Sequence, residues 1–205
     1  MISFNNLLSH HFSPAPTGLL KSEIKRKIFH FLSLLYLLGY IFLERGLILK
    51  ILMTAMAFVT LIEFGRFFSP DLNLRIVKLF RGIHRAKEFY QPSGIFWTLL
   101  SSLLTMGLFY KKEIVVCSMG YLIFGDTASA LIGTMYGRHR VLNKSLEGSI
   151  AFFCVSLLIS FLLFNPLVAI ASSIFATIIE LLPLPYNDNF WIPILSAVFL
   201  TLIVP

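Results

Sequence analysis

The segment from residue 124 to residue 149 holds side chains that can bind phosphate and a metal ion. Asp126 stands between Gly125 and Thr127 inside an otherwise apolar run. Carboxylates bind Mg²⁺, which prefers oxygen ligands and bridges phosphates, while cations neutralise the charge of phosphoryl oxygens during transfer. We therefore expect a nucleotide phosphate site without a P-loop, with a charged loop beside a packed helix as the alternative. The charged residues that follow are Arg138, Arg140, Lys144 and Glu147.

Small residues recur at every fourth position of the same segment, at Gly125, Ser129, Gly133 and Gly137. Such a stripe lets a neighbouring helix approach closely, and this packing role is compatible with a site. It does not account for Asp126, which lies off the stripe.

A second cluster lies at the start of the first apolar run. Its members are three or four residues apart, counting from Glu23 to Arg26 or Lys27 and from either of these to His30. On a helix such residues can share one face. The basic residues also mark the cytoplasmic flank of a membrane span, so the cluster has a simpler interpretation.

A third group lies near the C-terminus, where Glu180 interrupts an apolar run and Asp188 follows in an Asx-rich turn. An ordinary turn explains residues 187–189. A carboxylate inside an apolar helix needs a further reason, because an ionisable group in a membrane span costs a few kcal/mol. The same argument applies to Glu63 and Asp126.

The elements that carry these residues are predicted to be membrane-spanning helices. The chain of 205 residues is 57% hydrophobic and only 13% charged, against about 25% charged residues in soluble domains. In lipid, backbone groups must pair within the segment, so apolar runs form helices. We expect an all-α polytopic bundle of about seven spans, at residues 28–43, 47–62, 94–110, 114–136, 150–164, 167–182 and 191–204.

The distribution of basic residues predicts the orientation of this bundle. With seven spans, thirteen Lys and Arg fall on the side of the N-terminus and four on the other, which indicates a cytoplasmic N-terminus. The net charge of +7 is thus better explained by cytoplasmic loops and anionic lipid than by nucleic acid. The four outer residues are Arg45, Lys50, Lys111 and Lys112.

Two further segments are assigned a place at the membrane. Residues 71–89 form a predicted amphipathic helix on the inner surface, with Arg75, Lys78, Arg81 and Arg85 on its basic face. Residues 1–22 are expected to be a lead-in rather than a secretory signal, because they lack a basic region followed by an apolar core.

Four ordered motifs resemble those of the membrane-bound CTP-dependent lipid kinases, namely dolichol kinase, phytol kinase and CTP-dependent diacylglycerol kinase. Their nucleotide segment is in turn similar to that of phosphatidate cytidylyltransferases. One departure is Asn187, where an aspartate commonly stands. The motifs are Glu23-x-x-Arg26-Lys27-x-x-His30, Gly125-Asp126-Thr127 through Gly137-Arg138, Lys144-Ser145-x-Glu147-Gly148-Ser149, and Ala176-Thr177-x-x-Glu180 with Asp188-Asn189 and Pro193.

The resemblance implies a lipid kinase domain over residues 23–205, with CTP and Mg²⁺ bound on the cytoplasmic side. Asp126 and Glu147 are the expected metal ligands, and Asp126, Glu180 and His30 the expected catalytic residues. The residues expected to bind the nucleotide are Arg26, Lys27, Gly125, Thr127, Gly133, Arg138, Arg140, Lys144, Ser145, Glu147, Gly148, Asp188 and Asn189.

Three functional hypotheses follow. The first is transfer of the γ-phosphoryl group of CTP to a membrane lipid alcohol, an isoprenoid alcohol such as phytol or a polyprenol before diacylglycerol. The second is a phosphatidate cytidylyltransferase, although the chain ends in an apolar run instead of that family's C-terminal signature. The third is a small proton-coupled transporter that uses the intramembrane acids. The sequence leaves the oligomeric state open.

Overall fold

The computed structural model describes residues 16–80 and 86–204, and this part of the chain is almost entirely helical. The predicted all-α class is therefore confirmed. The helices are α2 (Pro16–Phe31), α3 (Ser33–Phe42), α4 (Arg45–Phe68), α5 (Pro70–Leu79), α6 (Gly94–Leu108), α7 (Lys112–Gly120), α8 (Asp126–Tyr136), α9 (Leu146–Phe161), α10 (Pro166–Leu181) and α11 (Asp188–Ile203), with a 3₁₀ turn η1 (Ala86–Phe89) and a π-helical turn η2 (Tyr121–Gly125).

Local sequence explains where several helices begin. The Ser93 hydroxyl accepts a hydrogen bond from the backbone N–H of Phe96 at the start of α6. Asn165 caps α10 in the same way and is followed by Pro166 at the first helical position. Both arrangements satisfy backbone N–H groups that have no partner within the helix.

Each predicted span coincides with helix, but within the described residues only two helical segments are long and apolar enough to cross a membrane. They are Arg45–Phe68, with 24 residues, and the continuous segment Lys112–Tyr136, with 25. Helices α6, α9, α10 and α11 have 15 or 16 residues, or about 24 Å against a hydrocarbon core of about 30 Å. The apolar helices support a membrane protein, whereas the number of seven spans is not established.

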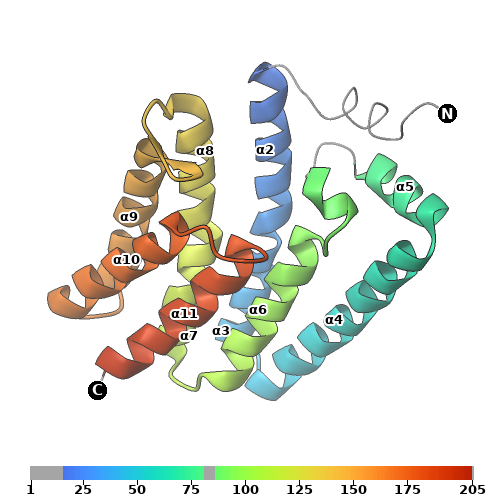
Figure 1. Cartoon of the computed structure of the whole chain (residues 1–205). Helices are drawn as coiled ribbons and strands as arrows, with labels where there is room; N and C mark the ends of the chain where they lie inside the picture. Colours follow the sequence, from blue (N-terminus) through green and yellow to red (C-terminus); the bar gives the residue numbers. More distant parts are fainter. Residues whose placement is uncertain (1–15, 81–85, 205) are drawn as a thin grey trace.

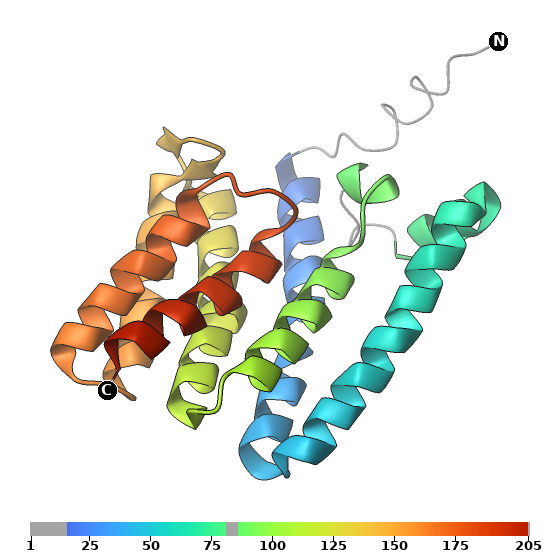
Figure 2. The ribbon, with the colours of Figure 1, turned by 60° about the horizontal axis from the view of Figure 1, so that its bottom comes forward.

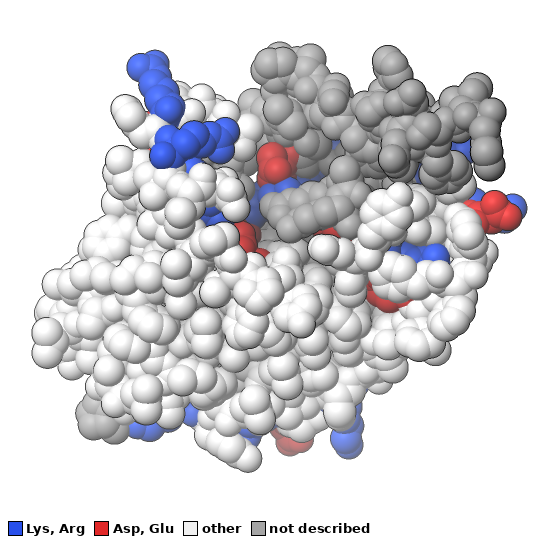
Figure 3. Space-filling view, viewed as in Figure 1, with Lys and Arg blue, Asp and Glu red and all other residues white. Residues whose placement is uncertain are grey.

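The bundle has α4 at one edge and α9 and α10 at the other (Figures 1 and 2). Helix α2 lies between α8 and α6, and α11 packs against α6, α7 and α10. Charged side chains on the face drawn in Figure 3 gather mainly along its upper and lower edges, with uncharged side chains between them. The arrangement brings the three predicted clusters, from α2, α8 and the α10–α11 connection, to one end of the bundle.

One feature differs from the sequence predictions, and two others were not predicted. The amphipathic helix ends at Leu79, and its predicted residues Arg81 and Arg85 lie outside the described residues. Helix α2 begins at Pro16, within the predicted lead-in. The loop after α8 contains an antiparallel hairpin, β1 (Arg140–Val141) and β2 (Lys144–Ser145).

Candidate nucleotide and phosphoryl-transfer site

Asp126 lies where the π-helical turn η2 passes into α8. Its backbone N–H donates to the carbonyl of Tyr121, five residues back, instead of the usual four. Such π-turns inside helices are frequent at functional sites. The carboxylate is buried and forms an ion pair with the buried ammonium of Lys27 on α2. A residue from the first motif thus neutralises the central acid of the second.

His30 lies one helical turn beyond Lys27 on α2 and contacts the π-helical turn η2. Its Nε2 lies 2.9 Å from the carbonyl oxygen of Leu122 and 4.0 Å from Oδ2 of Asp126. A carbonyl can only accept, so Nε2 carries the hydrogen, and in the neutral ring Nδ1 is the acceptor. Any role for His30 as a base must therefore use Nδ1.

Glu180 on α10 is surrounded by donors and is only 1% exposed. One carboxylate oxygen accepts from Ser129 at 2.8 Å and the other from Ser149 at 3.0 Å. The ammonium of Lys144 lies 2.8 Å from the first oxygen and 2.9 Å from Asp188. Because its oxygens are already engaged, Glu180 is arranged to hold Lys144 in place rather than to bind a metal.

The charge state of Lys144 follows from these neighbours. Burial disfavours its charged ammonium. The carboxylates of Asp188, Glu180 and Asp126 outweigh that effect, so the pKa of Lys144 is raised above its usual 10.5. Lys144 is therefore a fixed positive charge at neutral pH, suited to an anionic ligand.

The hairpin that carries Lys144 is fixed at both ends. Ser145 caps α9 by accepting from the backbone N–H of Gly148 at 3.1 Å. Glu147 accepts from the His139 backbone N–H, and its Oε1 lies 2.8 Å from Nδ1 of the His139 ring. The backbone N–H of Glu147 and the His139 side chain lower the pKa of Glu147 to about 2. Glu147, predicted as a metal ligand, thus closes the loop between α8 and α9.

The predicted small-residue stripe is a close contact between helices. A Cβ at Gly133 would lie 2.7 Å from Oγ of Ser145, and one at Gly148 would lie 2.7 Å from the carbonyl oxygen of Ser129. At Gly125 a Cβ would approach the ring of Phe152 to 3.0 Å. These glycines let α8 and α9 approach closely.

The largest cavity described is about 670 Å³ and lies between the hairpin, α2, α8 and the end of α10. Its volume is in the range of nucleotide-sized ligands. Its polar lining includes three cationic side chains and three carboxylates besides Glu23. Predicted residues that line it are Arg26, Asp126, Gly133, Arg140, Lys144, Ser145, Glu180 and Asp188.

Other predicted residues lie elsewhere. Lys27, His30 and Asn189 line a second, smaller cavity next to the first. Arg138 is exposed on the loop after α8. The Thr127 hydroxyl donates to the carbonyl of Ile123 within its own helix. These positions leave the roles predicted for Arg138 and Thr127 as predictions.

Several lining residues were not predicted from the sequence. Ser93, Thr98 and Tyr36 line the smaller cavity, together with Glu88 from η1. Serine and threonine are common in apolar helices and usually bond to a carbonyl of their own helix. The only sequence signal was the Pro92-Ser93-Gly94 turn, which places a helix start near this end of the bundle.

The acids of the site fit a Mg²⁺ ion that is held partly by carboxylates and partly by the phosphates of a substrate. Among the described residues, no group of three or more His, Cys, Asp or Glu side chains could by itself hold a metal ion. Mg²⁺ is commonly held by one or two carboxylates together with substrate phosphates. Asp126 and Asp188, which both line both cavities, provide such a pair.

Comparison with known proteins identifies relatives over most of the chain. It is 33% identical over 195 residues to the uncharacterized protein RP860 of Rickettsia prowazekii, covering 89% of this chain and 95% of that protein. It is 26% identical over 219 residues to CTP-dependent diacylglycerol kinase 1 of Saccharomyces cerevisiae, covering 90% and 74%. The Eremothecium gossypii protein of the same name is 27% identical, covering 90% and 68%. No protein-family model and no solved structure matches the chain.

Proposed function

We propose that the chain, which belongs to one family with the Rickettsia prowazekii protein, phosphorylates a membrane lipid alcohol with CTP. Its similarity to two fungal CTP-dependent diacylglycerol kinases supports this activity. The oxygen of the lipid hydroxyl attacks the γ-phosphorus, the bond to the β-phosphate oxygen breaks, and CDP leaves. The hydroxyl proton passes to a base in the site.

The observation that carries this proposal is the lining of the larger cavity. Positive charge reaches this cavity from the hairpin, through Arg140 and Lys144, and from α2, through Arg26. Asp126 and Asp188 line the same cavity. Phosphoryl transfer needs little covalent chemistry from the protein and depends on positioning and charge neutralisation. Cations beside carboxylates in one cavity meet that requirement.

We assign the cations to the phosphates and two acids to the metal. Lys144, fixed by Glu180, and Arg140 would neutralise the triphosphate, and Asp126 with Asp188 would hold Mg²⁺. When bound, the metal would supply positive charge that offsets the negative charge of the phosphates. Asp188 thus replaces Glu147 in the metal role expected from the sequence, because Asp188 lines both cavities and Glu147 lines neither.

Each acid assigned to the metal is paired with a lysine in the described structure, Asp126 with Lys27 and Asp188 with Lys144. With a nucleotide in the larger cavity, Lys27 and Lys144 would face its phosphates, and the two carboxylates would be available to hold the metal. Nδ1 of His30 and the Asp126 carboxylate are the candidates to accept the hydroxyl proton.

The same proposal places the site at the cytoplasmic side of the membrane. The site lies at the end of the bundle that also holds the start of α2, the end of α4 and helix α5, which carry predicted inner Lys and Arg residues (Figure 1). Positive residues favour the cytoplasmic side of short loops. Diacylglycerol is the first acceptor to test, because the fungal relatives carry that name, and phytol and polyprenols follow.

The decisive experiment uses the purified full chain in detergent with Mg²⁺ and CTP labelled either at the γ- or the α-phosphate. We expect γ-label in a phosphorylated lipid and CDP as the second product. Phosphatidate is assayed beside these alcohols, and transfer of the α-label to phosphatidate with release of pyrophosphate would identify a cytidylyltransferase instead. No transfer from either nucleotide to diacylglycerol, phytol, polyprenol or phosphatidate would overturn the proposal and favour a transport role. Asp126→Asn serves as the inactive control.

A further inference from the structure

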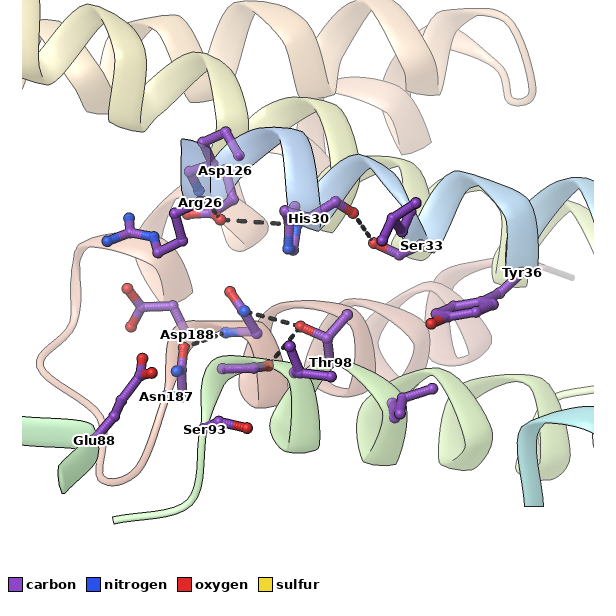
Figure 4. A pocket seen from close by; sticks show the side chains of 16 residues that line it. Arg26, His30, Ser33, Tyr36, Glu88, Ser93, Thr98, Asp126, Asn187 and Asp188 are labelled. Carbon is purple, nitrogen blue, oxygen red and sulfur yellow. Dashed lines mark hydrogen bonds and ion pairs between the residues drawn. The ribbon is translucent and has the colours of Figure 1, made fainter. Parts of the chain in front are cut away.

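A second cavity of about 220 Å³ lies beside the first, between α2 and α3 on one side and α6 with the start of α11 on the other. Figure 4 shows Arg26, His30, Ser33 and Tyr36 following one another along α2 and α3, opposite Ser93 and Thr98. The cavity therefore runs along the helices.

The polarity of the cavity changes along its length. Arg26 and Asp126, with Lys27 paired to Asp126, lie at one end, and Tyr36 lies at the other (Figure 4). From Lys27 to Tyr36 the chain advances nine residues, or about 14 Å along a helix. One end can thus hold a reacting hydroxyl while the other holds hydrocarbon.

The polar end is shared with the larger cavity. Arg26, Asp126 and Asp188 line both spaces. A ligand in the smaller cavity therefore meets a ligand in the larger one at these three side chains. This is the geometry that a transfer between two substrates requires, because the reacting atoms must approach to about 3 to 3.5 Å.

We propose that the smaller cavity binds the acceptor and that it recognises a glycerol ester, that is, a diacylglycerol. This inference rests on the proposed function for the identity of the reaction. A cavity of this size is below the usual range for a whole ligand, about 300 to 1,000 Å³. It holds the glycerol head and the first acyl carbons, and the acyl chains leave past Leu32, which lines the cavity and is 48% exposed.

Ester recognition is assigned to Asn189, which lines the cavity beside Thr98. Its Nδ2 donates to the Thr98 hydroxyl at 2.9 Å, and the Thr98 hydroxyl donates to the carbonyl of Gly94 at 2.9 Å. An amide nitrogen carries two hydrogens, so Asn189 has a second N–H for an ester carbonyl. An isoprenoid alcohol has no carbonyl to accept it. Thr98 holds the side-chain amide, and the Asn187 side chain holds the backbone of Asn189 by accepting from its N–H at the cap of α11.

The first test fills the cavity. Ile95→Trp places a larger side chain at its apolar wall, and Leu108→Trp, on the exposed face of the same helix, is the matched control. We expect at least a tenfold rise in KM for dioctanoylglycerol in the Ile95 variant, with KM for CTP unchanged and no change in the control. CTP-induced thermal stabilisation of both variants verifies that they fold. An unchanged acceptor KM in folded Ile95→Trp would overturn the inference.

The second test concerns the ester. The probes are dioctanoylglycerol and its diether analogue, which lacks both carbonyls. We expect the natural chain to prefer the diester by about tenfold, the effect of one hydrogen bond. Asn189→Ala should abolish this preference, so that the diester and the diether are phosphorylated with equal kcat/KM. An equal preference in Asn189→Ala and the natural chain would remove Asn189 from recognition.

A binding measurement separates this inference from the proposed function. Dioctanoylglycerol with a photoreactive diazirine on one acyl chain should label peptides from α3 and α6 without nucleotide, and Ile95→Trp should abolish labelling. Such labelling without any CTP-dependent phosphorylation would retain the lipid cavity and refute the kinase. Phosphorylation with labelling confined to other helices would retain the kinase and refute this cavity as its acceptor site.

Discussion

The ammonium of Lys27 on α2 pairs with the carboxylate of Asp126 on α8, 99 residues later in the chain, and both groups are buried. The pair joins the N-terminal motif to the Gly-Asp-Thr motif. It also places a positive charge directly beside the acid that we assign to the metal. Stability and activity therefore depend on this pair in different ways.

Lys27→Met should destabilise the protein by about 3 to 5 kcal/mol, because it leaves the Asp126 carboxylate buried without a partner. The double variant Lys27→Met with Asp126→Asn should recover most of that loss, since neither member is then charged. Activity should fall by about 100-fold or more in both. Thermal unfolding in detergent and labelled-CTP transfer measure the two effects.

A double variant as unstable as Lys27→Met would show that the ion pair is not the source of the loss. Recovery of transfer activity in the double variant would remove both residues from the proposed chemistry. Lys25→Met, at an exposed position of the same helix, is the control for loss of a basic residue.

The pH dependence of stability should report the charge on Lys144. Its pKa in the folded protein is raised above 10.5, so its ion pairs stabilise the fold fully below that pH. The contribution is lost as the pH rises through the raised pKa. The midpoint of thermal unfolding should therefore fall above pH 10.5 in the natural chain and fall less in Lys144→Met.

The control for Lys144→Met is Lys112→Met, at the opposite end of the bundle. Lys112 is exposed, and its ammonium donates to the carbonyl of Ile41. In Lys112→Met the midpoint of thermal unfolding should fall above pH 10.5 as it does in the natural chain. Identical alkaline profiles for Lys144→Met and the natural chain would refute the coupling between Lys144 and its acids.

Glu147 provides a test between loop closure and metal binding. Its pKa is lowered to about 2 from the usual 4.5, so the stabilisation is present above pH 4.5 and is lost as the pH falls toward 2. Glu147→Gln should remove this acid-dependent part of the stability. The Mg²⁺ concentration for half-maximal activity should stay unchanged, because Asp188 is the second proposed ligand.

The comparison variant is Glu113→Gln, which removes an exposed carboxylate from the first turn of α7. It should preserve the acid dependence. A Mg²⁺ requirement raised tenfold or more in Glu147→Gln would restore Glu147 as a metal ligand, as the sequence motif suggested.

The sequence predicted the helices and the acids, but not their partners. Glu180 and Asp126 were recognised because a carboxylate in an apolar run is costly and must serve a purpose. The partners of Glu180, Ser129 and Ser149, are ordinary residues in the sequence and become important only once α8, α9 and α10 pack together. Pairings between distant helices carry no local signal.

In the amphipathic segment, by contrast, a tertiary contact overrides the helical periodicity of the sequence. Periodicity predicted one helix over residues 71–89, but α5 ends at Leu79. Asn73 is buried, and its amide donates to the carbonyl of Phe89 at 3.1 Å. This contact brings η1 back against α5, which a continuous helix from Asn73 to Phe89 would prevent, since it would separate them by about 24 Å.

Arg66 should be the main determinant of that arrangement. It is 1% exposed and donates to the carboxylate of Glu63 at 2.7 Å and to the carbonyls of Glu88 at 2.8 Å and Gln91 at 2.5 Å. Glu63 in turn accepts from the backbone N–H of Ser93 at 3.2 Å. Glu63, an ionisable residue flagged from the sequence, thus helps to hold the segment before α6 and is not part of either cavity lining described.

Arg66→Ala should destabilise the protein by about 3 to 5 kcal/mol, because a buried carboxylate and two carbonyls lose their charged donor. Arg66→Lys should recover only part of this, since an ammonium cannot reproduce the planar set of donors. Because Glu88 and Ser93 line the acceptor cavity, KM for the lipid should rise more than KM for CTP in the lysine variant. Thermal unfolding, proteolysis between α5 and α6, and acceptor kinetics measure these effects, with exposed Arg75→Ala as the control. If Arg66→Ala unfolds at the same temperature as the natural chain, the segment between α5 and α6 is held by other contacts.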